Sequence, residues 1–170
     1  RTAIDNPERV ISLQLLAAGG TVAVPEVMER IRTSTRRAVE SNDVELTRKR
    51  MHLLMHDPAN ATEELVAIRH AIYQQPDFVA NIDNLLSLQD MDTRLRNILT
   101  PDQLAQITVP TLVVWGRNNP FGDVPEAQAM HENIPGSELV LFDDCGHWPQ
   151  HEQAAKYNEL SLAFLEKHPA

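Results

Sequence analysis

Residues 138–150 read ELVLFDDCGHWPQ, an apolar run followed at once by a turn that carries a histidine. The run Glu138–Phe142 is short, rich in Leu and Val and bounded by turn residues, which is typical of a buried parallel strand. Similar runs occupy Val10–Leu16 and Thr111–Trp115, and the second of these leads into the turn-rich stretch Gly116–Pro120. Because these runs alternate with loops and helical patterns, the sequence predicts an open parallel sheet of the α/β class.

The segment between the first two predicted strands shows a helical pattern and no strand signal. Its first helix can begin after Asn42 or Asp43 and its second after Asn60 or Thr62, since these side chains cap helices well. Pro76 ends the second helix and separates it from a third. The predicted helices span Val44–Met55, Glu63–Gln74 and Asp77–Leu88.

The predicted organisation is a helical cap inserted into an α/β core. Residues 20–100 form the cap, and residues 1–19 with 101–170 form the core. Three strands make a poor sheet, because an edge or a face stays exposed. We therefore expect the core to be the incomplete last part of a larger sheet, and Arg1–Pro7 to be the end of a helix.

The charge distribution argues against a nucleic-acid partner. The formal net charge is −9, so a phosphate backbone would be repelled. Residues 101–170 hold ten acidic and three basic residues, whereas residues 21–70 hold eight of each. The basic residues of the predicted cap are interleaved with acids and lack aromatic neighbours, so we expect a solvated face there.

The cysteine content and the hydropathy favour a cytoplasmic protein without a membrane partner. Cys145 is the only cysteine, which excludes an intrachain disulfide. No apolar run approaches the ~18 residues of a membrane span. The opening Arg1–Pro7 lacks the basic and apolar blocks of a signal peptide.

His147 is the first candidate for catalysis. It follows Gly146 in a turn after a predicted strand, and function in open α/β sheets gathers at the carboxyl ends of strands. An exposed histidine in such a turn suits a general base. A surface histidine in an ordinary β–α turn explains the same pattern, and the spacing alone does not choose between the two.

Three segments together resemble the C-terminal third of α/β-hydrolases. They are PTLVVWGR at 110–117, IPGSEL at 134–139 and DCGHWPQ at 144–150. More narrowly, the chain is similar to the meta-cleavage product hydrolases of aromatic catabolism, which cut a carbon–carbon bond in a dienoate. NPERV at 6–10 resembles the entry to their sixth strand, and residues 62–69 resemble a helix of their cap.

The resemblance implies roles for three residues. His147 matches the triad histidine, Trp148 a residue that lines the pocket beside it, and Arg69 a cap arginine that faces the substrate carboxylate. A guanidinium is a natural clamp for a carboxylate. The alternatives are core packing for Trp148 and, for Arg69, a solvated helix charge paired with Glu63 or Glu64.

The nucleophile of the family is missing from these residues. The Gly-x-Ser-x-Gly elbow does not occur, and Ser12, Ser34 and Ser41 lack the Gly-flanked turn that presents a nucleophile. The resemblance places the serine shortly before Arg1.

The acid of the family is also changed. Asn119 stands where the family places an aspartate, and an amide can hold the histidine tautomer but cannot stabilise the imidazolium by charge. In serine proteases the Asp-to-Asn change costs about 10⁴ in turnover. Asp123 is the alternative acid, although it could instead cap a helix from Pro125. We favour Asp123 slightly, because a charge is worth more here and Gly122 allows the loop to bend.

The sequence predicts no metal site and no cysteine nucleophile. His52 with His56, and His147 with His151, are spaced for one helix face, but no carboxylate or cysteine at ligand spacing completes either set. Cys145 has no second base to activate it. The resemblance likewise implies no cofactor and no metal, and it implies a homodimer or larger assembly.

The predicted function is hydrolysis of a carbon–carbon bond in a 2-hydroxy-6-oxohexa-2,4-dienoate-type product. The substrate would be small, anionic and derived from an aromatic ring, with His147 as base and the serine outside this chain. The alternatives are another cap-bearing hydrolase, such as an esterase or epoxide hydrolase, and a non-catalytic homologue that binds a ligand. Arg69 and Trp148 favour the carbon–carbon hydrolase over an esterase or epoxide hydrolase. The absent elbow and Asn119 favour the non-catalytic homologue.

Overall fold

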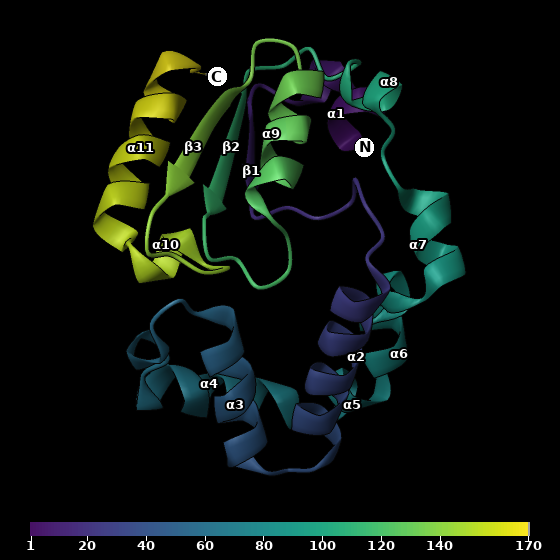
Figure 1. Ribbon diagram of the computed structural model, residues 1–170, viewed down its shortest axis with the longest axis vertical. Helices are drawn as coiled ribbons and strands as arrows, with labels where there is room; N and C mark the ends of the chain where they lie inside the picture. Colours follow the sequence, from purple (N-terminus) through teal and green to yellow (C-terminus); the bar gives the residue numbers. More distant parts are fainter. Residues whose placement is uncertain (170) are drawn as a thin grey trace. The chain divides into compact units, whose positions relative to one another are not determined.

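The structure, a computed structural model, describes residues 1–169 and divides into two compact units (Figure 1). The core unit comprises Arg1–Thr21 and the chain from Leu99 onward, and the cap unit comprises Val22–Ile98. Residues 20, 21, 99 and 100, predicted to lie in the cap, belong to the core unit.

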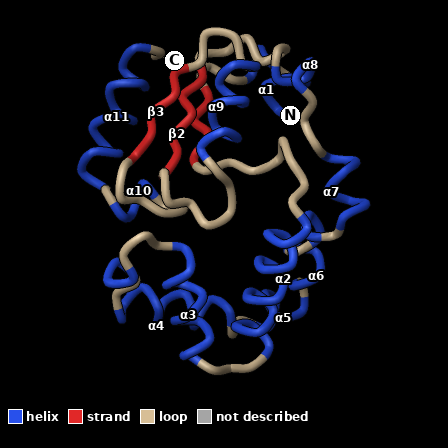
Figure 2. Tube along the Cα trace, in the orientation of Figure 1, coloured by secondary structure: helices blue, strands red, loops and turns tan. Residues whose placement is uncertain are grey.

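The core unit contains a parallel sheet of three strands in the order β1-β2-β3 (Figure 2). The strands are β1 (Leu13–Leu16), β2 (Thr111–Gly116) and β3 (Glu138–Phe142). The predicted α/β class is therefore confirmed. The first strand begins at Leu13 and not at Val10 as predicted, since Val10 N–H closes the preceding 3-10 turn η1 (Pro7–Arg9) and Ile11 is exposed.

The middle strand carries the core on both of its faces. All six residues of β2 are buried, which explains their continuous apolar run. Val113 packs with the cluster of α9 (Val124–Asn133), and Leu112 packs with Phe164 of α11 (Ala154–Lys167). Because neighbouring side chains of a strand point to opposite faces, α9 packs on one face of the sheet and α11 on the other.

The first strand is an open edge of the sheet in the described residues. Each of its four residues is only partly buried, and its one partner in residues 1–169 is β2. Beside it lies a mainly apolar cavity of about 220 Å³, with Leu13, Leu15, Ile107 and Met130 among its lining residues. Within the described residues β1 has a neighbouring strand on one side only. Its other side is therefore exposed, as the sequence predicts for a sheet of three strands.

Four short elements complete the core unit. They are α1 (Thr2–Asp5), η1, α8 (Pro101–Leu104) and α10 (Pro149–Glu152). Thr100 and Gln103 form a reciprocal capping box at the start of α8, where the chain returns from the cap unit.

The cap unit is helical throughout, as the sequence indicates. Its longer helices are α2 (Pro25–Glu40), α3 (Val44–Leu54), α4 (Glu63–Tyr73) and α7 (Met91–Asn97), and its short elements are η2 (Pro58–Asn60), α5 (Pro76–Ala80), α6 (Ile82–Leu85) and η3 (Ser87–Gln89). Of the candidate caps, the structure selects Asp43, which accepts from Glu45 N–H at 2.9 Å, and Thr62, which accepts from Leu65 N–H at 3.2 Å.

The prediction of one helix over Asp77–Leu88 is wrong. The segment is broken into α5, α6 and η3. Asn81 ends α5, and its side-chain amide donates to the carbonyl of Asp77 at 2.8 Å. Asn is a weak helix former because its side chain bonds to nearby backbone groups, and it sits here at the break.

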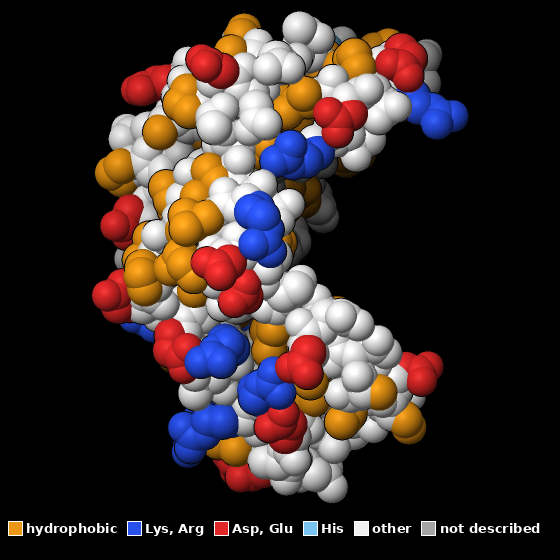
Figure 3. All heavy atoms as spheres, turned by 90° about the vertical axis from the view of Figure 1, so that its right-hand side faces the viewer, with side chains coloured by type: hydrophobic (Ala, Val, Ile, Leu, Met, Phe, Trp, Pro, Cys, Tyr) orange, Lys and Arg blue, Asp and Glu red, His pale blue; other side chains and the backbone are white. Residues whose placement is uncertain are grey.

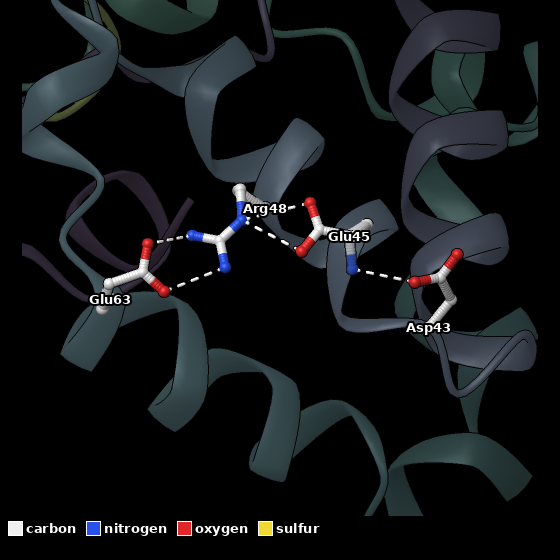
Figure 4. A network of polar contacts seen from close by, with 4 residues as sticks. All are labelled: Asp43, Glu45, Arg48 and Glu63. Carbon is white, nitrogen blue, oxygen red and sulfur yellow. Dashed lines mark hydrogen bonds and ion pairs between the residues drawn. The ribbon is translucent and has the colours of Figure 1, made fainter.

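Several basic residues of the cap unit are paired with acids, as expected of a solvated face; Arg32, Arg36 and Arg48 are among them. On α3, Arg48 binds Glu45 of its own helix and Glu63 at the start of α4 (Figure 4). The hydrogen bonds to Glu63 and Glu45 raise the pKa of Arg48 above its ordinary value. Figure 3 shows basic and acidic side chains interspersed on the face of the cap unit turned to the viewer.

Candidate active site

The site forms where the loops that follow β2 and β3 are joined by backbone hydrogen bonds. Arg117 N–H donates to the carbonyl of Phe142 at 2.9 Å, and Asn118 N–H donates to that of Cys145 at 2.9 Å. Both loops leave the carboxyl ends of neighbouring parallel strands, which is where open α/β sheets place their sites.

Gly116 makes this close approach possible. A Cβ atom at position 116 would lie 2.0 Å from the carbonyl oxygen of Gly146 and 2.4 Å from that of Cys145. Both obstacles are backbone atoms, so no side-chain movement relieves the collision. Any larger residue at position 116 has to push the two loops apart.

We therefore expect Gly116→Ala to destabilise the protein by about 3 kcal/mol, the upper end of the cost of overpacking a core. Gly136→Ala is the matched control: Gly136 has a φ of +70° but nothing within 4 Å of its Cβ position, so only backbone strain of about 1–2 kcal/mol applies. Urea unfolding of both variants measures the difference. Equal losses in the two variants would contradict the steric account.

His147 and Asn119 come together across the two loops. The Nδ1 atom of His147 lies 3.0 Å from the Oδ1 atom of Asn119, and the side chain of Asn119 is buried. Asn119 Oδ1 also accepts from the backbone N–H of Phe121 at 3.2 Å. A backbone N–H can only donate, so this contact identifies the side-chain atom as the oxygen.

The same contact determines the histidine tautomer. An amide oxygen only accepts, so His147 has to carry its proton on Nδ1. The lone pair then lies on Nε2, the nitrogen that acts as the base in a Ser-His-Asp triad. The edge of the Phe121 ring packs against the imidazole at a centroid distance of 5.0 Å and an interplanar angle of 83°.

Of the two candidate partners of His147, the structure places Asn119 beside the ring, and which of them assists catalysis stays a prediction. Asp123 is exposed, and the side chain hydrogen-bonded to His147 Nδ1 is that of Asn119. Asp123 also does not cap a helix from Pro125: α9 begins at Val124, and the Asp123 side chain makes no capping hydrogen bond. The loop does not bend as expected at Gly122, because Trp115 Nε1–H holds the Gly122 carbonyl at 3.0 Å.

Two residues beside His147 were not singled out by the sequence analysis. One is Phe121, whose backbone and ring both support the histidine pair. The other is Glu152, whose Oε1 accepts from Gly146 N–H at 2.9 Å and from Trp148 N–H at 3.2 Å. Glu152 lies four residues after the N-cap Trp148, one position beyond the glutamate of a capping box, so the usual sequence signal does not reveal this contact.

Trp148 and Cys145 flank the histidine differently. Trp148 is half-buried, and its ring meets His151 edge-on at a centroid distance of 6.2 Å. Cys145 is buried, and burial followed by the charge of Glu152 raises its pKa to about 12. A thiol with that pKa is not a nucleophile near neutral pH, in keeping with the sequence analysis.

Arg69 lies in the cap unit, on α4. It is half-buried, and its guanidinium carbon lies 5.7 Å from the centroid of the Tyr73 ring, in cation–π range. Glu63, one of the two acids suggested as its partner, binds Arg48. The role of Arg69 toward a substrate stays a prediction.

Within residues 1–169, no cluster of three or more His, Cys, Asp or Glu side chains is arranged to hold a metal ion. No helix in the described part of the chain has the length and apolar character needed to cross a membrane.

Comparisons with known proteins agree with the architecture. The model of the "Alpha/beta hydrolase family" matches residues 6–160, so the chain belongs to that family. The chain is 33% identical over 176 residues to the 2-hydroxy-6-oxononadienedioate/2-hydroxy-6-oxononatrienedioate hydrolase 2 of Pseudomonas putida, covering 96% of this chain and 57% of that protein. It is 31% identical over 169 residues to the 2-hydroxy-6-oxo-6-phenylhexa-2,4-dienoate hydrolase of Comamonas testosteroni, covering 97% and 57%.

A solved structure shares the fold. The meta-cleavage product hydrolase from Pseudomonas fluorescens IP01 superposes with a TM-score of 0.83 at 23% identity, over 99% of this chain and 60% of that one. The resemblance drawn from the residues is thereby confirmed. The chain spans little more than half the length of the curated relatives it matches.

Proposed function

We propose that these residues form the histidine-bearing part of a serine hydrolase that cleaves a carbon–carbon bond in a 2-hydroxy-6-oxo-dienoate. The observation that carries the proposal is the Asn119–His147 contact, which leaves the basic nitrogen of the imidazole at Nε2. The printed activities of relatives about 30% identical support the substrate class.

In the proposed mechanism, His147 Nε2 removes the proton from a serine that a segment outside these 170 residues supplies. The serine oxygen attacks the ketone carbonyl, the carbon–carbon bond breaks, and the imidazolium returns its proton to the departing carbon fragment. A water molecule that loses its proton to His147 then cleaves the acyl-serine ester, which releases the acid and regenerates the serine. His147 also moves protons while the dienol becomes a ketone. Asn119 holds the Nδ1–H tautomer throughout, but its neutral amide leaves the imidazolium without a facing charge at that position.

Arg69 would bind the carboxylate of the dienoate, and Trp148 would line the pocket beside His147. A planar guanidinium can form two parallel hydrogen bonds to a carboxylate, which gives direction as well as charge. A cation in this role discriminates between an anionic dienoate and a neutral ester. That difference separates the proposed enzyme from a general esterase or an epoxide hydrolase.

We expect Arg69→Met, in a complete enzyme that includes the serine segment, to raise KM for the dienoate about 10- to 100-fold. The loss corresponds to one hydrogen-bonded charge of about 1.5–3 kcal/mol. KM for a neutral ester should change less than about threefold, because no charge is bound there. Arg37→Met is the matched control, since Arg37 is an exposed arginine of the same unit.

Steady-state kinetics with the dienoate and with the neutral ester distinguish the proposed carbon–carbon hydrolase from a general esterase. Equal losses on dienoate and ester, or equal effects of the Arg69 and Arg37 variants, would contradict the carboxylate role. A complete protein that binds dienoate without turning it over would instead be a binding module, which the amide at position 119 favours. Homo-oligomeric assembly and cytoplasmic location stay predictions of the resemblance.

A further inference from the structure

A single carboxylate oxygen binds the backbone on both sides of His147. Glu152 Oε1 accepts from Gly146 N–H at 2.9 Å and from Trp148 N–H at 3.2 Å. The Sγ atom of Cys145 lies 3.9 Å from the same oxygen. Glu152 itself is half-buried at the end of α10, and it reaches back past the start of its own helix to make these contacts.

Other contacts of the loop that carries His147 come from the neighbouring loop and from Gln153, whose Nε2 donates to the carbonyl of Asp143 at 2.6 Å. The loop leaves β3 through Asp144, which has a left-handed φ of 49°, and its Cys145 carbonyl accepts from Asn118 N–H. The residues on either side of the histidine lie outside the sheet and before α10. Glu152 therefore supplies the hydrogen-bond acceptor for two amides in a segment where neither a strand nor a helix supplies one.

The contacts of Glu152 with the two amides matter more here than in a triad whose histidine faces an aspartate. A hydrogen bond to a neutral acceptor is roughly half as strong as one to an ionised acceptor. Asn119 is neutral, so the 3.0 Å side-chain contact holds the His147 ring less firmly than an aspartate would. The direction of the ring then depends more on how firmly the main chain of His147 is held.

We propose that Glu152 is a positioning residue for His147, which it orients by fixing the two flanking amides. This role rests on the proposed function of His147 as the base. Glu152 acts through the backbone and does not contact the reacting atoms. This role requires an acceptor oxygen at the end of a side chain as long as that of glutamate. We therefore expect glutamine at position 152 to preserve the role, and a side chain without an acceptor oxygen to lose it.

The test uses a complete protein that joins these residues to the serine segment, labelled with nitrogen-15. The variants are Glu152→Gln, Glu152→Ala and Glu152→Met, the last retaining bulk without an acceptor. Glu159→Gln and Glu159→Ala, at an exposed glutamate of α11, are the matched controls. The two readouts are the ring-nitrogen shifts of His147, which report the tautomer, and hydrogen exchange at the amides of Gly146 and Trp148.

In the unaltered chain and in Glu152→Gln we expect the Nδ1–H tautomer to dominate and exchange to agree within about threefold. In Glu152→Ala and Glu152→Met we expect a mixture of tautomers, and exchange at the two flanking amides faster by about tenfold or more, as the loss of a charge-assisted hydrogen bond implies. Amides of β2 should keep their exchange rates in every variant, which separates local positioning from general loss of stability.

Two results would overturn the role. One is an unchanged tautomer and unchanged exchange in Glu152→Met or Glu152→Ala; the other is a Glu152→Gln variant that behaves like Glu152→Met. If the alanine variant does not fold, the near-isosteric glutamine and methionine variants still give the comparison. Neither readout needs turnover, so an inactive complete protein would refute the proposed reaction and leave this result standing.

Discussion

Replacing His147 with alanine, in an enzyme that joins these residues to a nucleophile-bearing segment, is expected to lower kcat by about 10⁴-fold or more. Without the Nε2 lone pair nothing removes the serine proton, and the hydroxyl is a weak nucleophile at its ordinary pKa. Binding should be affected far less, since the proposed carboxylate clamp is Arg69. The measurement is single-turnover cleavage of a dienoate, which isolates the chemical step.

His52→Ala is the matched control, because His52 lies on α3 of the cap unit and has no proposed role. It should stay within about threefold of the unaltered enzyme. Retention of more than a tenth of kcat in His147→Ala would remove His147 from the base role. The 170 residues alone should cleave neither ester nor dienoate, and cleavage by the pure chain that His147→Ala abolishes would reveal a nucleophile among these residues.

Converting Asn119 into aspartate is expected to raise kcat about 10- to 100-fold. The Asp-to-Asn change in serine proteases costs about 10⁴, attributed to the wrong tautomer. Here the Asn119 oxygen faces Nδ1 and already favours the required tautomer, so the change adds a negative charge at that position. A carboxylate beside an imidazole typically favours its charged form by about one or two pKa units, which sets the size of the gain.

The companion variants separate the two loop residues. Asn119→Ala should lower kcat about 100-fold, because the imidazole loses the acceptor oxygen that Asn119 places at Nδ1. Asp123→Asn should change kcat less than about threefold, since Asp123 is exposed and is not the side chain bound to His147. Collapse of the rate in Asp123→Asn would restore Asp123 as the acid and contradict the geometry.

The pH dependence gives an independent check of the aspartate variant. A facing carboxylate raises the pKa of the imidazole, and the base works only when it is neutral. The acidic limb of the kcat/KM profile should therefore move to higher pH by about one unit or more in Asn119→Asp. A limb that stays in place while kcat rises would show that the gain comes from geometry and not from charge.

Local pattern in the sequence determined the architecture. The apolar runs identify three parallel strands, since a strand buried on both faces has to be apolar along its length. Cap residues and Pro76 place α3 and α4 nearly to the residue. The position of His147 after a strand makes it a candidate, because the ends of parallel strands meet at one edge of the sheet.

The tertiary structure alone decided which side chain of the neighbouring loop lies beside the imidazole of His147. Asn119 and Asp123 are both polar residues of one loop, and their spacing in sequence does not state which reaches across to the next strand. That choice follows from through-space contacts: Gly116 lets the loops touch, and Trp115 holds Gly122 in place. Periodicity records which face of an element is buried. It does not record which loops meet in space, because those contacts join backbone atoms of residues that lie far apart in the sequence.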